Sequence, residues 1–279
     1  MKYLKLKTNQ LLKLTKITIA LLLMLIFLSA SADKRFIILQ ATTSTQDSGL
    51  YDYLLPVFEN KFNIDVRVVA VGTGQALKNI QNCDGDIAIT HAKELELDYL
   101  SKKYINSREE FMYNDFIFIG PNQDPAMISS ALDPKDVLSR IYKTKSKFVS
   151  RGDGSGTHIS EQRLWNSSGL SPDEFKSSWY LDVGMGMGAT INVAVGINGY
   201  TFTDRATWVN FKNKGSHKML YSNHQILSNQ YSVLTPNHDV CGNIKTEMAD
   251  IFRKWLLSIE TKRLIEGYKV NQQQLFYIN

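Results

Sequence analysis

Short runs of β-branched and aromatic residues alternate with longer amphipathic stretches along most of this chain. Apolar runs without a helical period predict strands over 36–41, 66–71, 86–90, 116–120, 148–150, 179–183 and 200–203. Apolar residues spaced three or four apart predict helices over 50–60, 75–82, 94–104, 136–145, 157–166, 190–198 and 204–212. A capping-box signal at 171–174 predicts a further helix start, and the tail is expected to be helical from about residue 244. This alternation is typical of an α/β protein with largely parallel sheets.

The first 32 residues have the pattern of a secretory signal peptide. Five lysines precede an apolar run at 17–28, and the small residues at 29–32 follow it. We expect cleavage after Ala32 and a mature chain that begins near Asp33, without a cysteine there to carry a lipid anchor. An uncleaved membrane anchor is the alternative, although the apolar run is short for a span. The leader therefore predicts an exported protein.

The basic charge of the chain belongs to this leader. Removing its five lysines from the 32 Lys and Arg leaves 27, which equals the 27 Asp and Glu. A mature chain without excess positive charge is not expected to bind nucleic acid. Cys83 and Cys241 are too few for a disulfide framework, so a single disulfide and two buried free thiols both stay open.

Four predicted strand-to-helix loops share an unusual composition of Ser, Thr and Gly, at 42–49, 72–74, 151–157 and 184–190. In open α/β sheets such loops meet beyond the carboxyl ends of the strands, where ligands bind. Any one of them is explained by helix caps and turns. Together they offer many neutral donors and one arginine, which suits a buried dianion. We therefore predict an anion site around Arg151, with Asp153 orienting the guanidinium.

Other chemistries fit less well. The glycines at 184–188 match a dinucleotide fingerprint, but they come late in an exported chain, so no cofactor is expected. Ser155 stands near Asp153 and His158, yet the glycine spacing is not that of a nucleophile elbow. The five histidines lack metal-ligand spacing, which predicts no metal site.

Five blocks of the mature chain resemble those of the periplasmic tungstate-binding proteins of ABC importers: 41–50, 71–76, 112–116, 150–158 and 199–205. The resemblance implies an α/β, two-lobed periplasmic binding protein fold of type II with the ligand between the lobes. It further implies chain crossings near 114–118 and 230–234. Lobe one would comprise residues 33–116 and 231–279, and lobe two residues 117–230.

The resemblance also implies the function. The protein would be a monomeric receptor without catalytic activity, which captures tungstate or molybdate and delivers it to ABC permease subunits in the inner membrane. Its ligand-binding residues would be Thr43, Ser44, Thr73, Arg151, Ser155, Gly156 and Thr157. Arg151 would supply the charge, Gly156 its N–H, and the others hydroxyl or backbone N–H donors.

Two alternatives stay open. A phosphate receptor of the same fold would need an acceptor for the proton that phosphate carries at neutral pH. His91 stands where phosphate-binding relatives have an aspartate, and it either meets the ligand or only caps the next helix. A secreted serine hydrolase would instead use Ser155 as its nucleophile.

Overall fold

Eight strands pair along one path, in the order β2-β1-β3-β9-β4-β7-β5-β6. The structure is a computed structural model that describes residues 35–175 and 178–279, so the signal peptide expected at 1–32 lies outside the described residues. At one end of the path, β1 (Phe36–Thr42) is parallel to β2 (Asp65–Val71) and β3 (Ile87–Thr90). At the other end, β5 (Phe148–Ser150) is parallel to β6 (Tyr180–Asp182) and β7 (Tyr200–Asp204).

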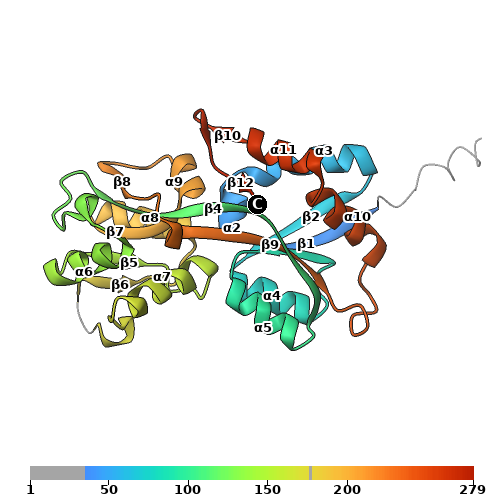
Figure 1. The fold of residues 1–279 in the computed structure, drawn as a ribbon, viewed down its shortest axis with the longest axis horizontal. Coiled ribbons are helices and arrows are strands. Elements are labelled where there is room, and N and C mark those ends of the chain that lie inside the picture. Colours follow the sequence, from blue (N-terminus) through green and yellow to red (C-terminus); the bar gives the residue numbers. More distant parts are fainter. Residues whose placement is uncertain (1–34, 176–177) are drawn as a thin grey trace, which may run out of the picture. The chain divides into compact units, whose positions relative to one another are not determined.

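The long strand β4 (Ile105–Pro121) joins these two sets of strands (Figure 1). Up to Asp115 it is antiparallel to β9 (Ser228–Pro236), and from Phe116 on it is antiparallel to β7 and β8 (His217–Tyr221). The partner strand therefore changes between two adjacent residues. We call the second half all elements between Phe116 and the start of β9. The first half comprises the elements before Phe116 together with β9 and the elements after β9.

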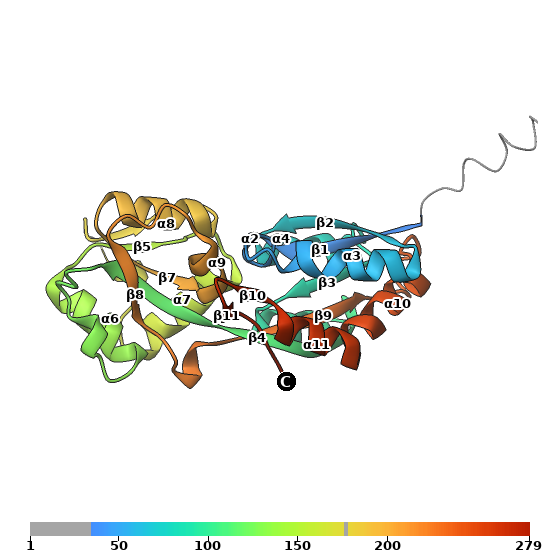
Figure 2. The ribbon, with the colours of Figure 1, turned by 90° about the horizontal axis from the view of Figure 1, so that it is seen from above.

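Helices follow the strands in the way the pattern predicts. In the first half they are α2 (Thr43–Asp47), α3 (Leu50–Phe62), α4 (Thr73–Gln81), α5 (Lys93–Ser101), α10 (Thr246–Leu256) and α11 (Ile259–Gly267). In the second half they are α6 (Pro134–Thr144), α7 (Gly156–Ser167), α8 (Met187–Gly196) and α9 (Arg205–Asn210). Figure 2 shows α8 and α6 on opposite faces of the strands of the second half. None of the helices among residues 35–175 and 178–279 is long and apolar enough to cross a membrane.

The expected α/β class is confirmed, and most expected strands and helices appear within a few residues of their predicted bounds. The strand expected at 116–120 is only the last part of β4, which begins at Ile105. Within each set of strands at the ends of the path the pairing is parallel, as expected, whereas β4 and β9 run antiparallel to their neighbours. Two expectations need correction. The capping signal at 171–174 begins only a 3₁₀ turn, Pro172–Glu174. The tail is helical only to Gly267, after which come the short strands β10 (Lys269–Val270), β11 (Gln273–Gln274) and β12 (Tyr277–Ile278).

Each half has a hydrophobic core of its own. The core of the first half packs strands β1 and β3 against α3 and α10, with Phe58, Phe252 and Trp255 in mutual ring contact. The core of the second half is built around Trp165 and Phe148, whose rings meet edge to face. Since each set of strands is packed by its own helices, the loops at the carboxyl ends of both sets rest on rigid supports.

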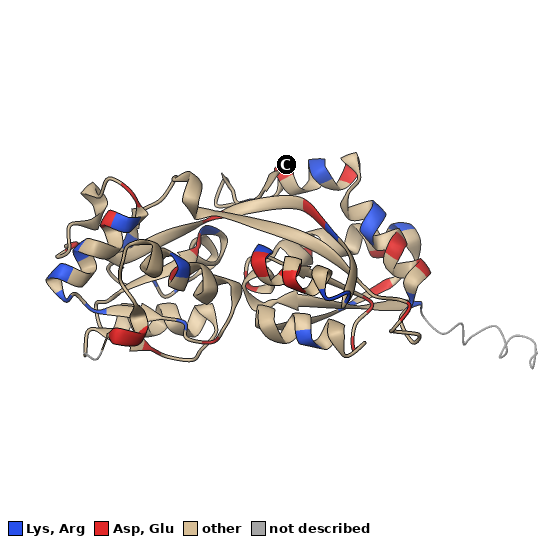
Figure 3. Cartoon of the chain, turned by 60° about the horizontal axis from the view of Figure 1, so that its bottom comes forward, with Lys and Arg blue, Asp and Glu red and all other residues tan. Residues whose placement is uncertain are grey.

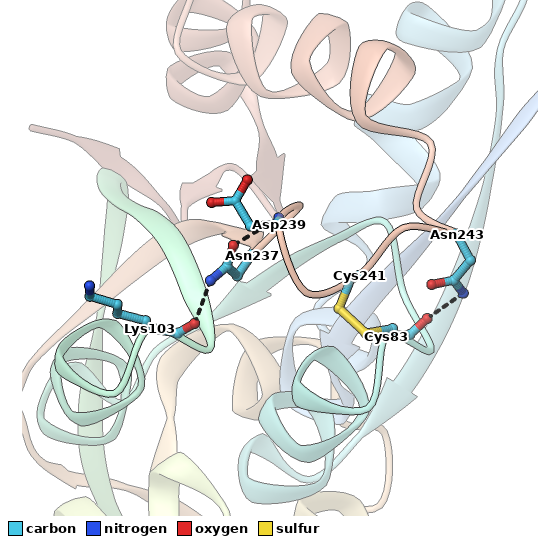
Figure 4. Close-up of a disulfide and its surroundings, with 6 residues drawn as sticks. All are labelled: Cys83, Lys103, Asn237, Asp239, Cys241 and Asn243. Carbon is cyan, nitrogen blue, oxygen red and sulfur yellow. Dashed lines mark hydrogen bonds between the residues drawn. A yellow bond between two sulfur atoms is a disulfide. The ribbon is translucent and has the colours of Figure 1, made fainter.

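A disulfide between Cys83 and Cys241 answers the question that the sequence left open. It links Cys83, two residues beyond the end of α4, to Cys241 in the loop that follows β9 (Figure 4). Asn243 Nδ2 donates to the Cys83 carbonyl at 3.1 Å beside it. Basic and acidic residues are interspersed along both halves of the chain (Figure 3).

Candidate functional site

Residues 151–157 comprise the loop between β5 and α7 and the first two residues of α7, and they carry the only arginine of the four donor-rich loops. Its turn depends on Gly152 and Gly154, which have φ of +60° and +67° in the left-handed region. A Cβ at Gly152 would also lie 1.2 Å from Asp182 Oδ1. The glycines of this segment are therefore explained by backbone geometry. We call residues 151–157 the arginine loop.

The guanidinium of Arg151 is buried, with 2% of the residue exposed. It forms an ion pair with Asp153, as predicted, and Asp153 also accepts from the Ser155 N–H at 3.1 Å. Burial raises the pKa of Asp153, but Arg151 and Ser155 outweigh this effect and hold the pKa below its usual value. The arginine is thus fixed by a carboxylate of its own loop, which leaves its remaining donors oriented.

The positive charge of Arg151 acts to lower the pKa of carboxyl groups on several elements. Burial raises the pKa of Asp47 at the end of α2, and Arg151 opposes the rise. Burial raises the pKa of Asp204 to about 6, while hydrogen bonds from Thr207 and the Arg151 charge oppose it. Arg151 therefore lies where α2 of the first half and the end of β7 converge.

Direct contacts bring the predicted loops together. The Gly156 N–H donates to Thr73 Oγ1 at 3.0 Å, which joins the arginine loop to the first residue of α4. Ser44 Oγ lies 3.1 Å from His91 Nε2. A Cβ added at Gly156 would lie 2.8 Å from His91 Cε1. Residues 44, 73, 91 and 156 therefore form one cluster that spans both halves.

Two polar groups at this cluster are buried without a hydrogen-bond partner among the described residues. They are Arg151 Nε and Thr157 Oγ1. A buried donor that lacks a partner costs about 1–3 kcal/mol, so each such donor needs an explanation. Both donors belong to the arginine loop and the first turn of α7, where the helix dipole favours negative charge.

The remaining predicted residues have mixed outcomes. Ser155 caps α7, since its Oγ accepts from the His158 N–H at 3.3 Å. The Gly156 N–H, expected to be free for a ligand, is instead engaged by Thr73. Thr43 is partly buried at the start of α2. The loop at 184–190 lies against the arginine loop, because the Met185 N–H donates to the Arg151 carbonyl at 3.0 Å.

The constellation for serine hydrolysis does not form. His158 Nδ1 accepts from the Gly154 N–H at 3.1 Å, and its Nε2 lies 3.1 Å from Gln162 Nε2. Neither ring nitrogen is bonded to the Ser155 hydroxyl, which is the contact that a general base would need. Among residues 35–175 and 178–279, no group of three or more His, Cys, Asp or Glu could hold a metal ion.

The sequence did not single out Asn229, whose Oδ1 lies 2.9 Å from His91 Nδ1. Asn229 is on β9, 138 residues from His91, and β9 itself was not predicted. The only sequence signal for this contact was His91 itself, which follows a predicted strand. A contact between side chains so far apart in sequence leaves no local pattern.

Comparisons with known proteins place this chain in a family. Residues 29–260 match the PBP superfamily domain. The tungstate-binding protein TupA of Peptoclostridium acidaminophilum is 40% identical over 84% of this chain and 82% of its own length. Among solved structures, a tungstate ABC transporter protein from Geobacter sulfurreducens is 38% identical, with a TM-score of 0.77 over 84% of this chain and 98% of its own. The tungstate-binding protein TupA from Desulfovibrio alaskensis is 39% identical, with a TM-score of 0.76 over 88% and 99%.

Proposed function

Because the chain belongs to the PBP superfamily and, within it, to the family of the tungstate-binding proteins of ABC transporters, we propose that it is a receptor for tungstate. The mature protein begins near Asp33, works in the periplasm and delivers the anion to the permease of an ABC importer. It binds its ligand without catalysing a reaction. The observation that carries the proposal is the pair of buried, unpartnered donors, Arg151 Nε and Thr157 Oγ1.

The two halves of the sheet act as lobes in this proposal, divided as residues 33–116 with 231–279 and residues 117–230. The anion binds where the arginine loop of one lobe meets the loops at residues 43–44 and 73 of the other. An anion that bonds to both lobes favours the closed state over the open one by those extra contacts. The hydrogen bond between Gly156 and Thr73 joins the two halves directly, which supports a closed arrangement of the lobes.

Thr43, Ser44, Thr73, Ser155 and Thr157 form the neutral part of the proposed ligand set beside Arg151, and Ser44, whose hydroxyl is engaged by His91, contributes through its backbone N–H. The Thr73 hydroxyl accepts from Gly156 and keeps its own proton to donate. The Ser155 hydroxyl likewise accepts from His158 and keeps its proton. In this arrangement Gly156 contributes by allowing the loops to approach closely, and its N–H donates to Thr73 and not to the anion.

The state of His91 favours tungstate over phosphate. Both of its ring nitrogens are hydrogen bonded inside the protein, to Ser44 and Asn229. His91 therefore offers no free acceptor for the proton that phosphate carries at neutral pH. Tungstate and molybdate are fully deprotonated there and need donors alone, so the site suits both. A hydrolase finds no support, since His158 is not bonded to Ser155.

Calorimetric titration of the mature protein tests the proposal. Tungstate, molybdate, sulfate and phosphate are titrated in turn at neutral pH. We expect tight binding of tungstate, with phosphate weaker or without detectable heat. Phosphate binding as tight as tungstate binding would instead make the protein a phosphate receptor, and no heat with any of the four anions would overturn the anion site.

A further inference from the structure

His91 follows β3 and belongs to the cluster of residues 44, 73, 91 and 156. Each of its ring nitrogens has a hydrogen-bond partner. Asn229 Oδ1 lies 2.9 Å from Nδ1, and Ser44 Oγ lies 3.1 Å from Nε2. An amide oxygen can only accept a hydrogen bond, so the proton of the neutral ring is on Nδ1. The other nitrogen must then accept, and its donor is the Ser44 hydroxyl.

The amide of Asn229 is oriented by partners on both strands that run between the halves. Its Nδ2 donates to Asn114 Oδ1 at 2.7 Å and to the Tyr231 hydroxyl at 3.3 Å. Asn114 on β4 and Asn229 on β9 are also register partners in the sheet. Because Nδ2 is held by Asn114 and Tyr231, Oδ1 is the atom that faces His91.

The backbone on either side of His91 is fixed as well. Glu96 Oε1 accepts from the Thr90 hydroxyl at 2.7 Å and from the Ala92 N–H at 2.8 Å. Arg108 Nε donates to the other oxygen of Glu96 at 2.8 Å. The segment that carries His91 is therefore anchored to α5 and β4, and the ring has little freedom to turn.

We propose that His91 is a positioning residue that acts as the Nδ1–H tautomer, accepts a hydrogen bond from the Ser44 hydroxyl at Nε2 and thereby fixes the loop at 42–48 for the anion. His91 does not touch the ligand in this assignment. Ser44 supports binding by holding its loop, and its hydroxyl does not donate to the anion. Ser44 and His91 thus work as one unit, whereas the unpartnered Thr157 hydroxyl works independently of them. The effect on affinity rests on the proposed function, while the tautomer does not.

The tautomer is read by long-range ¹H–¹⁵N spectra of the histidine rings in the wild-type mature protein without any anion. Loss of one set of signals in His91→Gln assigns His91 among the five histidines. We expect a proton on Nδ1 and an unprotonated, hydrogen-bonded Nε2. A proton on Nε2 would overturn the proposal, whatever the protein binds.

Two substitutions at His91 separate its hydrogen bond from its packing. Gln keeps an acceptor within reach of Ser44 but lacks the ring, and Phe keeps the ring but lacks both nitrogens. We expect His91→Phe to weaken tungstate binding about ten-fold or more, as for loss of a buried hydrogen bond, and His91→Gln to recover most of it. Recovery by Phe and not by Gln would show a packing role and contradict the proposal. Thermal melts establish that each variant is folded.

A double-mutant cycle tests the coupling. Ser44→Ala combined with His91→Phe should bind tungstate no more weakly than either single variant. Thr157→Val combined with His91→Phe should show losses that add. Additive losses for the Ser44 pair would overturn the proposal. If wild-type protein binds none of the four anions, the proposed function fails, and the tautomer spectra still decide the assignment of His91.

Discussion

Thr73 Oγ1 accepts a hydrogen bond of 3.0 Å from the backbone N–H of Gly156, 83 residues further along the chain. The bond connects the first turn of α4 in the first half to the first turn of α7 in the second. Gly156 has room for no side chain there, because a Cβ would lie 2.8 Å from His91 Cε1 and 3.1 Å from Thr73 Oγ1. Close approach of the two halves therefore depends on this glycine.

Gly156→Ala is expected to weaken tungstate binding about ten-fold or more, since forcing a methyl group into such contacts costs about 1–3 kcal/mol. The backbone of Gly156 is helical, so the alanine strains only the contact with the first half. Gly188→Ala on α8 is the matched control, because nothing lies within 4 Å of its Cβ position. Calorimetry of both variants measures the difference. Equal affinities would show that the loops do not approach this closely when the anion is bound.

Arg151→Ala should weaken tungstate binding by about 2–5 kcal/mol, the usual loss when one member of a buried charge pair is removed. Arg151→Lys restores the charge without the fork of donors and should recover only part of the affinity. Arg140→Ala on α6 is the control, since Arg140 bonds to Asp136 and to backbone groups of its own neighbourhood. Unchanged affinity in Arg151→Ala would refute the proposed site.

An exposed ion pair also links the two halves. Arg163 Nη1 on α7 lies 2.6 Å from Glu94 Oε1 on α5. Because both side chains are more than half exposed, the pair should add only about 0.2–1 kcal/mol to tungstate binding, so Glu94→Gln should weaken binding at most about five-fold. The loss should shrink at high salt.

The control for this pair is Asp98→Asn, which breaks an ion pair with Lys102 inside α5. Asp98 and Lys102 are comparably exposed but belong to one helix, so their loss should leave the affinity unchanged. Titrations at low and high salt compare the two variants. An equal effect of both would mean that helix α5 as a whole, and not the link between the halves, is responsible.

The sequence was sufficient for the parallel strands and their loops, and insufficient for the strands that join the halves. The first part of β4 carries Arg108, Glu109 and Glu110, whose charges hide a strand pattern. Two of these charges are satisfied by distant residues, Arg108 by Glu96 and Glu109 by Arg253. Such pairing permits burial of charged residues in a strand, but it is visible only once the chain is folded.

The site divides in the same way. Arg151 and its loop could be predicted, because glycines and hydroxyl residues at a strand-to-helix junction have a local signature. The hydrogen bond between His91 and Asn229 has none, and neither does the engagement of the Gly156 N–H by Thr73. The sequence therefore predicts candidate donors but not the contacts that engage the Gly156 N–H and the His91 ring.

The disulfide between Cys83 and Cys241 closes a loop with a sequence separation of 158 residues, so it should stabilise the fold by restricting the unfolded chain. Replacing both cysteines by serine is expected to lower the free energy of unfolding by about 2–4 kcal/mol. Tungstate affinity should not change, because Cys83 lies beyond the opposite end of α4 from Thr73. Denaturant titrations measure the first effect and calorimetry the second. A double variant as stable as wild type would mean that the disulfide adds nothing to stability.

Glu161 on α7 makes the stability of the fold sensitive to pH. Burial raises its pKa from 4.5 to about 8, and hydrogen bonds from Ser150, Tyr180 and Trp165 only partly oppose this rise. A carboxyl whose pKa is raised on folding binds more protons in the folded state than in the unfolded one. Its contribution to stability is therefore present below about pH 4.5 and is lost as the pH rises towards 8.

Glu161→Gln keeps a neutral side chain of the same shape at every pH, with an oxygen for Trp165 and Tyr180 and an amide group that donates to Ser150. The melting temperature of this variant minus that of wild type should therefore become more positive as the pH rises from 5 to 8. The difference cancels other titrating groups, including His91, whose pKa burial lowers to about 4 and whose effect on stability has the opposite sign. A difference that stays constant over this range would show that Glu161 is ionised in the folded protein, held by its three donors as a buried carboxylate.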